Sequence, residues 1–134
     1  MKASEAMVAD PHVAVAGAMA SEVAIMLKTR NISVVPVVDD HRTRRFLGTL
    51  SDRDLVTRCL AEGKHPWHTR VDSLMRKSSV ARPEQELTGY QVRMDLDPTD
   101  SHLRPTITVV DGEGRVIGFI SHPEQVPGVE IVWG

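Results

Sequence analysis

The sequence is poor in cysteine, in aromatic residues and in excess charge, and each shortage excludes a class of protein. Its 134 residues include one cysteine, which excludes an intrachain disulfide and a cysteine-rich zinc site. Two Trp, one Tyr and two Phe are too few for a platform that stacks single-stranded nucleic acid. The net charge of −2 lacks the basic excess of a dedicated nucleic-acid binder.

Long apolar runs are also missing. The longest stretch without a formal charge, Pro11 to Ser21, is about half of the ~20 residues that a membrane-spanning helix needs. Glu5 and Asp10 interrupt the N-terminal region, so it has no apolar core of a signal peptide. The composition, 41% apolar and 25% charged, is that of a globular chain. We expect a soluble cytoplasmic protein with no membrane contact.

The chain contains an internal repeat. Two strands joined by a polar turn are predicted twice, at Val35–Asp39 with Leu47–Ser51 and at Thr108–Asp111 with Val116–Ser121. Asp39 and Asp111 are 72 residues apart, and Met7 and Met75 extend the match upstream at an offset of 68. We predict an α+β protein with a first unit at 1–63, a linker at 64–70, and a second, partly eroded unit with a C-terminal tail at 71–134.

Periodicity predicts the elements of each unit. The first unit should contain an extended piece at His12–Ala16, helices at Ala18–Arg30 and Ser51–Gly63, and a buried strand at Ile32–Val38. The second should contain a helix from Pro83 to Met94, cut short by Asp97-Pro98, then a brief turn at Ser121–Glu124 and an extended tail at Val129–Trp133.

The segment Gly48-Thr-Leu-Ser-Asp-Arg-Asp54 places polar side chains where a predicted strand turns into a predicted helix. Unpaired N–H groups at a helix start attract anions, and Arg53 can bind a phosphate with two parallel hydrogen bonds. Asp54 can accept from the two hydroxyls of a sugar, so the segment suits a nucleotide. The Ser51-x-x-Asp54 spacing is equally that of a capping box, in which both side chains satisfy backbone N–H groups.

Two stretches resemble a known family. Ile32-Ser-Val-Val-Pro-Val-Val-Asp39 followed by Gly48-Thr-Leu-Ser-Asp-Arg-Asp-Leu55 is similar to the cystathionine-β-synthase (CBS) domain signature. Arg104-Pro-Thr-Ile-Thr-Val-Val-Asp111 through Gly118-Phe-Ile-Ser121 is a weaker version. The resemblance covers Met7 to about Val126. It implies two β-α-β-β-α units packed through their sheets, two clefts related by a pseudo-twofold axis, and a homodimer.

The resemblance also implies a ligand. Clefts of this family often bind adenosine nucleotides or S-adenosylmethionine, so AMP, ADP, ATP or S-adenosylmethionine is expected here, and no cofactor is required. The acidic residue at the Asp54 position holds the ribose, the Ser51 hydroxyl assists, and Arg53 lies near the phosphate. The first cleft is implied to comprise Ser33, Thr49, Ser51, Arg53, Asp54, Ser79, Arg104, Pro105 and Thr106.

The second cleft departs from the family pattern. Glu124 is one methylene longer than the family's aspartate, Pro123 precedes it, and Ala14 stands where the family often has threonine. The residues implied to line this cleft are Ala14, Ile32, Val34, Phe119, Ser121 and Glu124. We expect this cleft to be empty or structural.

Catalytic and metal-binding patterns are not supported. No glycine-flanked nucleophile occurs, so we do not expect an enzyme. Asp95-x-Asp97-x-Thr99 begins like a calcium loop, but Asp100 stands where the turn needs glycine. The pair His65 and His68 has no further ligand nearby, so no metal site is expected. Cys59 lies on the apolar face of its helix and is interpreted as a core residue.

Three functional hypotheses follow. The first is a stand-alone regulatory module that binds an adenosyl ligand in the cleft between the units and signals in trans to an unknown protein target. The alternative is a non-enzymatic interaction or dimerisation module without nucleotide binding, in which Ser51 and Asp54 only cap a helix. A third and weaker hypothesis is an RNA or DNA accessory protein that uses Arg42, Arg44 and Arg45, a loop that equally suits a solubilising role.

Overall fold

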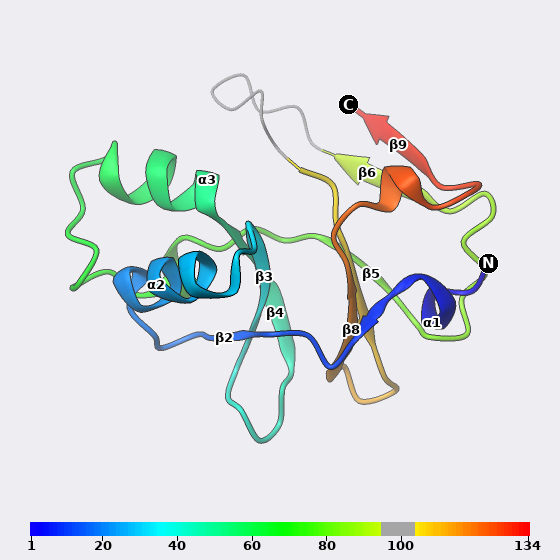
Figure 1. The fold of residues 1–134 in the computed structure, drawn as a ribbon, viewed down its shortest axis with the longest axis horizontal. Coiled ribbons are helices and arrows are strands. Elements are labelled where there is room, and N and C mark those ends of the chain that lie inside the picture. Colours follow the sequence, from blue (N-terminus) through cyan, green and yellow to red (C-terminus); the bar gives the residue numbers. More distant parts are fainter. Residues whose placement is uncertain (95–103) are drawn as a thin grey trace. The chain divides into compact units, whose positions relative to one another are not determined.

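The contacts within the chain divide it into two units, one of which combines the two ends of the sequence (Figure 1). The structure, a computed structural model, describes residues 1–94 and 104–134. The central unit contains residues His12–Lys77, and the terminal unit combines Met1–Pro11 with Ser78–Gly134. The predicted linker at 64–70 thus lies within the central unit. The predicted helix end at Asp97-Pro98 and the segment Asp95–Thr99 lie outside the described residues.

The central unit has the predicted β-α-β-β-α order. Its elements are β2 (Ala14–Val15), α2 (Ala20–Arg30), β3 (Val34–Val38), β4 (Phe46–Ser51), α3 (Asp52–Asp54), the π-helix η1 (Leu55–Leu60) and the 3-10 helix η2 (Val71–Ser73). The sheet order is β2-β3-β4, with β2 parallel and β4 antiparallel to β3. Figure 1 shows α2 and the α3–η1 helix on the same side of this sheet.

The core of the central unit lies between these helices and the sheet. Val23 and Leu27 from α2 pack with Val35 and Leu50 from the strands, because apolar residues at three and four spacing share one helix face. Cys59 of η1 belongs to the same cluster, which confirms that it is a core residue. Gly63, beyond the end of η1, has φ of 71°, a left-handed conformation that favours glycine.

The terminal unit consists mainly of strands. Its elements are α1 (Ala3–Ala6), β1 (Val8–Ala9), β5 (Ser79–Ala81), β6 (Gln91–Met94), β7 (Ile107–Val110), β8 (Val116–Ile120), the 3-10 helix η3 (Pro123–Gln125) and β9 (Glu130–Trp133). One sheet has the order β1-β8-β7-β5, and β6 pairs with β9 in a parallel two-stranded sheet. The β7–β8 hairpin, the brief turn after Ser121 and the extended tail were all predicted.

The helix predicted from Pro83 to Met94 is wrong. Its last four residues form β6, in which Val92 is buried while Gln91 and Arg93 are exposed. Gly89 has φ of 82°, which interrupts any helix there. The preceding backbone bonds to the N-terminal segment instead, through the amides of Ala3 and Ser4. These long-range partners replace the local bonds that a helix would have made.

The sequence repeat is also a structural repeat. A Cβ placed on Gly48 would lie 2.6 Å from the Arg76 carbonyl oxygen and 3.2 Å from the Met75 sulfur. A Cβ on Gly118 would overlap the side chain of Met7. Residues 75–76 therefore pack against β4, the second strand of the central hairpin. Residues 7–8 pack in the same way against β8, the second strand of the terminal hairpin. The bridge between Thr49 and Arg76 corresponds to the antiparallel pair of Phe119 and Val8.

Candidate functional site

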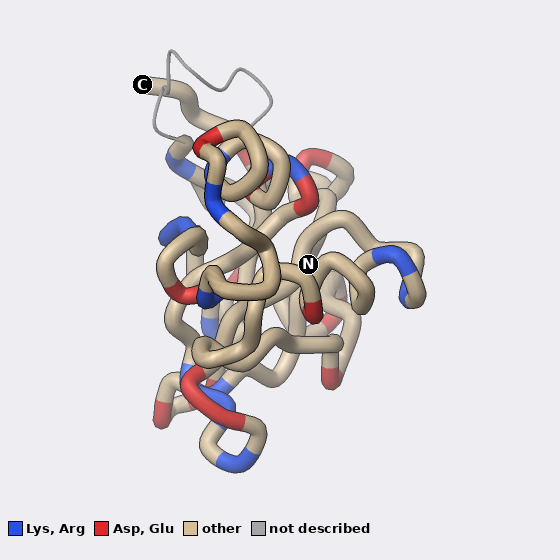
Figure 2. Tube along the Cα trace, turned by 90° about the vertical axis from the view of Figure 1, so that its left-hand side faces the viewer, with Lys and Arg blue, Asp and Glu red and all other residues tan. Residues whose placement is uncertain are grey.

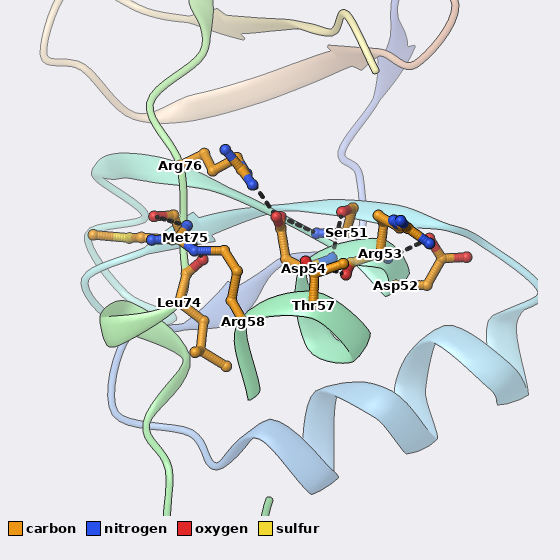
Figure 3. A network of polar contacts seen from close by, with 9 residues as sticks. All are labelled: Ser51, Asp52, Arg53, Asp54, Thr57, Arg58, Leu74, Met75 and Arg76. Atoms are coloured by element: carbon orange, nitrogen blue, oxygen red, sulfur yellow. Dashed lines mark hydrogen bonds and ion pairs between the residues drawn. The ribbon is translucent and has the colours of Figure 1, made fainter. Parts of the chain in front are cut away.

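The candidate site begins where β4 ends and α3 starts. The Asp54 amide donates to Ser51 Oγ at 3.0 Å, and the Ser51 amide donates to Asp54 Oδ2 at 3.0 Å. This reciprocal pair is the capping box that the spacing predicts (Figure 3). It fixes the carboxylate of Asp54 against the first turn of the helix.

The second oxygen of the Asp54 carboxylate faces a cation. Arg76 Nε donates to Asp54 Oδ1 at 2.7 Å, and the two side chains are 26% and 5% exposed. Such a charge-assisted bond is stronger than one between neutral groups. Solvent screens the Arg76 end, so the pair contributes less than the about 3–5 kcal/mol that is lost when a fully buried pair is broken.

The segment that carries Arg76 is held by further bonds. Arg58 of η1 donates through Nη1 to the carbonyl oxygens of Leu74 at 2.6 Å and Met75 at 3.2 Å. Arg76 and Thr49 exchange backbone bonds of 2.8 and 2.9 Å. Figure 3 shows Arg58 and Arg76 reaching this region from the helix and from the segment after η2. The main chain of residues 74–76 is therefore fixed to β4 and η1.

The remaining predicted residues of the central unit surround this network. The Ser33 carbonyl accepts from the Asp52 amide at 2.8 Å, so Ser33 lies beside the start of α3. Thr49, buried in β4, is two residues from Ser51 and projects from the same face of the strand. The Arg53 amide donates to Asp52 Oδ1 at 2.7 Å. The structure thus brings together Ser33, Thr49, Ser51, Arg53 and Asp54.

The other predicted residues of the first cleft belong to the terminal unit. Ser79 begins β5 and pairs with Ile107, next to Thr106. Arg104 and Pro105 precede β7, with Arg104 exposed. Thr106 is buried, and its Oγ1 atom has no hydrogen-bond partner in the described part of the chain. A buried hydroxyl of this kind carries an uncompensated desolvation cost that a ligand or water can remove.

Comparison with known proteins concerns the fold of the chain. Residues 3–61 match the CBS domain family. A CBS domain-containing protein of unknown function from Bacillus anthracis str. Ames Ancestor aligns with a TM-score of 0.71 and 17% identity over 90% of this chain and 86% of that one. The chain has the fold of a CBS-domain pair.

Two further CBS structures were solved with ligands. A CBS domain protein from Pyrobaculum aerophilum complexed with AMP aligns with a TM-score of 0.67 and 17% identity, covering 90% of this chain and 87% of that one. The CBS domain pair of protein MJ0100, in complex with 5′-methylthioadenosine and S-adenosyl-L-methionine, aligns with a TM-score of 0.64 and 21% identity. The alignment covers 90% of this chain and 92% of that one. At these sequence identities, the similarity shows the fold of this chain alone. No curated protein matches the chain in sequence.

The second copy of the repeat does not reproduce the Ser51–Asp54 geometry. Ser121 Oγ lies 3.0 Å from His122 Nδ1, and η3 begins after His122 without a side-chain cap. Pro123 opens η3, and Glu124 is exposed rather than buried. Of the other residues implied for this cleft, Ala14, Ile32 and Val34 lie in the central unit and Phe119 lies in the terminal unit. The capping box found in the central unit is not formed at Ser121 and Glu124.

Sequence reasoning missed Arg76. The signal was present in the repeat, because Met75 aligns with Met7 and the residue after each methionine differs. The central copy has Arg76 there, and the terminal copy has Val8. The change from an apolar to a charged residue marks this position as different in the two copies, and the structure shows that Arg76 pairs with Asp54.

Charges and possible metal ligands are dispersed elsewhere. Figure 2 shows basic and acidic positions interspersed along the trace. Within residues 1–94 and 104–134, no three His, Cys, Asp or Glu side chains are grouped so that they could hold a metal ion. Over the same residues, no helix combines the length and the apolar character needed to cross a bilayer.

Proposed function

We propose that this CBS-domain pair binds an adenosyl ligand through Asp54 and regulates a protein target in trans. The burial of Asp54 carries the proposal. Among the described residues it is the only charged side chain that is buried. An exposed aspartate caps a helix equally well, and burying a carboxylate is costly, so the cap alone does not account for its position.

Two other observations support an adenosyl ligand. The similar proteins solved with AMP, and with 5′-methylthioadenosine and S-adenosyl-L-methionine, have the same fold. The buried hydroxyl of Thr106, one of the residues expected to contact the ligand, lacks a partner within the described residues, as do those of Ser21, Ser78 and Thr108. In this proposal Asp54 accepts from the ribose hydroxyls, Ser51 assists, and Arg53 meets the phosphate. Ser33, Thr49, Ser79, Arg104, Pro105 and Thr106 complete the proposed contacts.

Calorimetric titration of AMP, ADP, ATP and S-adenosylmethionine tests this function. We expect saturable binding near one ligand per chain, abolished by Asp54→Ala. Asp52→Ala is the matched control, because Asp52 is in the same helical turn and its carboxylate meets only the neighbouring Arg53 amide among the bonds described above. This control should keep the affinity of the unmodified chain. Circular dichroism checks folding, since loss of a cap costs about 0.5–2 kcal/mol.

The alternative function is that of an interaction module, and two observations favour it. The capping box is complete and Asp54 already has a cationic partner, so both residues have a structural role without any ligand. The central unit also has an apolar groove of about 290 Å³ between α2 and η1. Absence of heat with all four ligands, together with an Asp54→Ala variant that is merely less stable, would leave Asp54 as a helix cap and direct the search to protein partners.

A further inference from the structure

The carboxylate of Asp54 is closed to a ligand in this conformation. Its side chain is 5% exposed, and its two oxygens accept from the Ser51 amide and from Arg76 Nε. A carboxylate has about four lone-pair positions, so it has the capacity to accept sugar hydroxyls as well. Access rather than capacity is therefore limiting, and some neighbouring group must move before a ribose reaches the carboxylate.

Arg76 is the neighbour that can move. The Ser51 amide belongs to the backbone at the end of β4 and is fixed by the strand. The Arg76 side chain is 26% exposed, and its long stem can swing toward solvent while the main chain stays bonded to Thr49. The carbonyl oxygens of Leu74 and Met75 remain bonded to Arg58 during such a movement. The backbone bonds of this segment therefore do not depend on the Arg76–Asp54 contact.

The repeat provides an internal comparison. Val8 occupies the position of Arg76 in the terminal copy, and the acidic residue there, Glu124, is exposed. The guanidinium thus occurs in the copy that has the buried carboxylate and not in the copy that lacks it. Val8 also shows that the segment packed against the strand forms with an apolar residue at this position.

We infer that Arg76 is a latch on the ligand site, a positioning residue whose release from Asp54 precedes ribose binding. This inference rests on the proposed function, because it assumes that Asp54 accepts from the ribose. A latch lowers the apparent affinity by the fraction of molecules in which the site is open. Removing the guanidinium should therefore strengthen binding, which is the opposite of the effect expected for a residue that contacts the ligand.

Titration of adenosine into the Arg76→Met variant tests the latch. Adenosine has no phosphate, so loss of a phosphate contact cannot mask the effect. We expect binding about tenfold tighter than in the unmodified chain, the factor for a latch that is closed nine times in ten. Arg70→Met is the matched control, since Arg70 is an exposed arginine of the same unit paired with Asp72 at 2.8 Å, and it should leave the affinity unchanged.

The outcomes separate this inference from the proposed function. AMP binding that depends on Asp54, with adenosine binding unchanged or weakened in Arg76→Met, would overturn the latch and leave the ligand site in place. Absence of binding in every chain would overturn both. If circular dichroism shows that Arg76→Met does not fold, Arg76→Lys provides a second variant, which keeps the charge but lacks Nε. Its affinity for adenosine should exceed that of the unmodified chain by less than the tenfold expected for Arg76→Met.

Discussion

At the scale of single residues, two glycines determine how closely residues 75–76 and 7–8 approach the hairpins. Neither Gly48 nor Gly118 has a positive φ, so their role is one of space. At Gly48 the nearest obstacle to a Cβ is a backbone oxygen, which cannot rotate away as a side chain can. The same approach places Arg76 beside Asp54, so the absence of a side chain at Gly48 is a condition for the site geometry.

Replacing Gly48 should therefore destabilise the fold. We expect Gly48→Ala to lower the free energy of unfolding by about 1–3 kcal/mol, the usual cost of an overpacked position. Gly17→Ala is the control, because its Cβ would meet nothing closer than Arg70 Nη2 at 3.8 Å, and it should change stability by less than about 0.5 kcal/mol. Urea unfolding measures both, and equal effects would contradict this explanation.

At the scale of elements, the two hairpins use the same stabilising device. In the central hairpin, the Thr43 hydroxyl, with the amides of Asp40 and Arg45, holds the pKa of Asp39 below its ordinary value of 3.8. In the terminal hairpin, the amide and guanidinium of Arg115 lower the pKa of Asp111. Each carboxylate accepts hydrogen bonds from backbone amides of the turn, which would otherwise bond to water.

Acid should weaken both turns. A carboxyl group whose pKa is lower in the folded chain than in the unfolded chain stabilises the fold at pH values above its unfolded pKa, near 3.8. This contribution is lost as the pH falls through the pKa of the folded chain. We expect Asp39→Asn with Asp111→Asn to lower the urea midpoint at pH 7, and the difference from the unmodified chain to shrink at pH 3. Glu62→Gln, an exposed change elsewhere, should show no such dependence. A difference that stays constant with pH would refute this account.

At the scale of the whole molecule, the groove between α2 and η1 is a candidate surface for association with another protein chain. Its lining consists of Ala20, Ser21, Ala24, Ile25, Leu55, Cys59, Leu60, Pro66 and Trp67. Ile25, Leu60 and Trp67 are each more than half exposed. Exposed apolar side chains gathered in this way are typical of an interaction surface, and a twofold axis would bring two such faces together. Since the resemblance implies a homodimer, we predict that a second copy of the chain covers this groove.

Sedimentation equilibrium tests this association. We expect a dimer that Leu60→Asp weakens more than about tenfold, because a charge would be buried at the interface. Leu47→Asp is the control, since Leu47 is an exposed apolar residue outside the groove, and the dimer should persist. A monomer in the unmodified chain at micromolar concentration would remove this proposal.

Sequence reasoning succeeded where the structure depends on local pattern. The helix at Ala20–Arg30, both hairpins and the Ser51–Asp54 capping box follow from spacing within a few residues. It failed for Gln91–Met94, because the partner of this strand, Glu130–Trp133, lies about forty residues later in the chain. The alternation of polar and apolar residues over Gln91, Val92, Arg93 and Met94 was the sequence signal that could have revealed the strand.

The sequence by itself determined the two-copy α+β design, the CBS resemblance and the polar residues at the end of the central hairpin. Tertiary structure decided three things that no local spacing contains. Residues 1–11 complete the unit of the C-terminal half, β6 pairs with β9, and Arg76 meets Asp54. Each joins segments distant in the chain, and such contacts form only when burial and pairing outweigh the entropy of closing the loop between them.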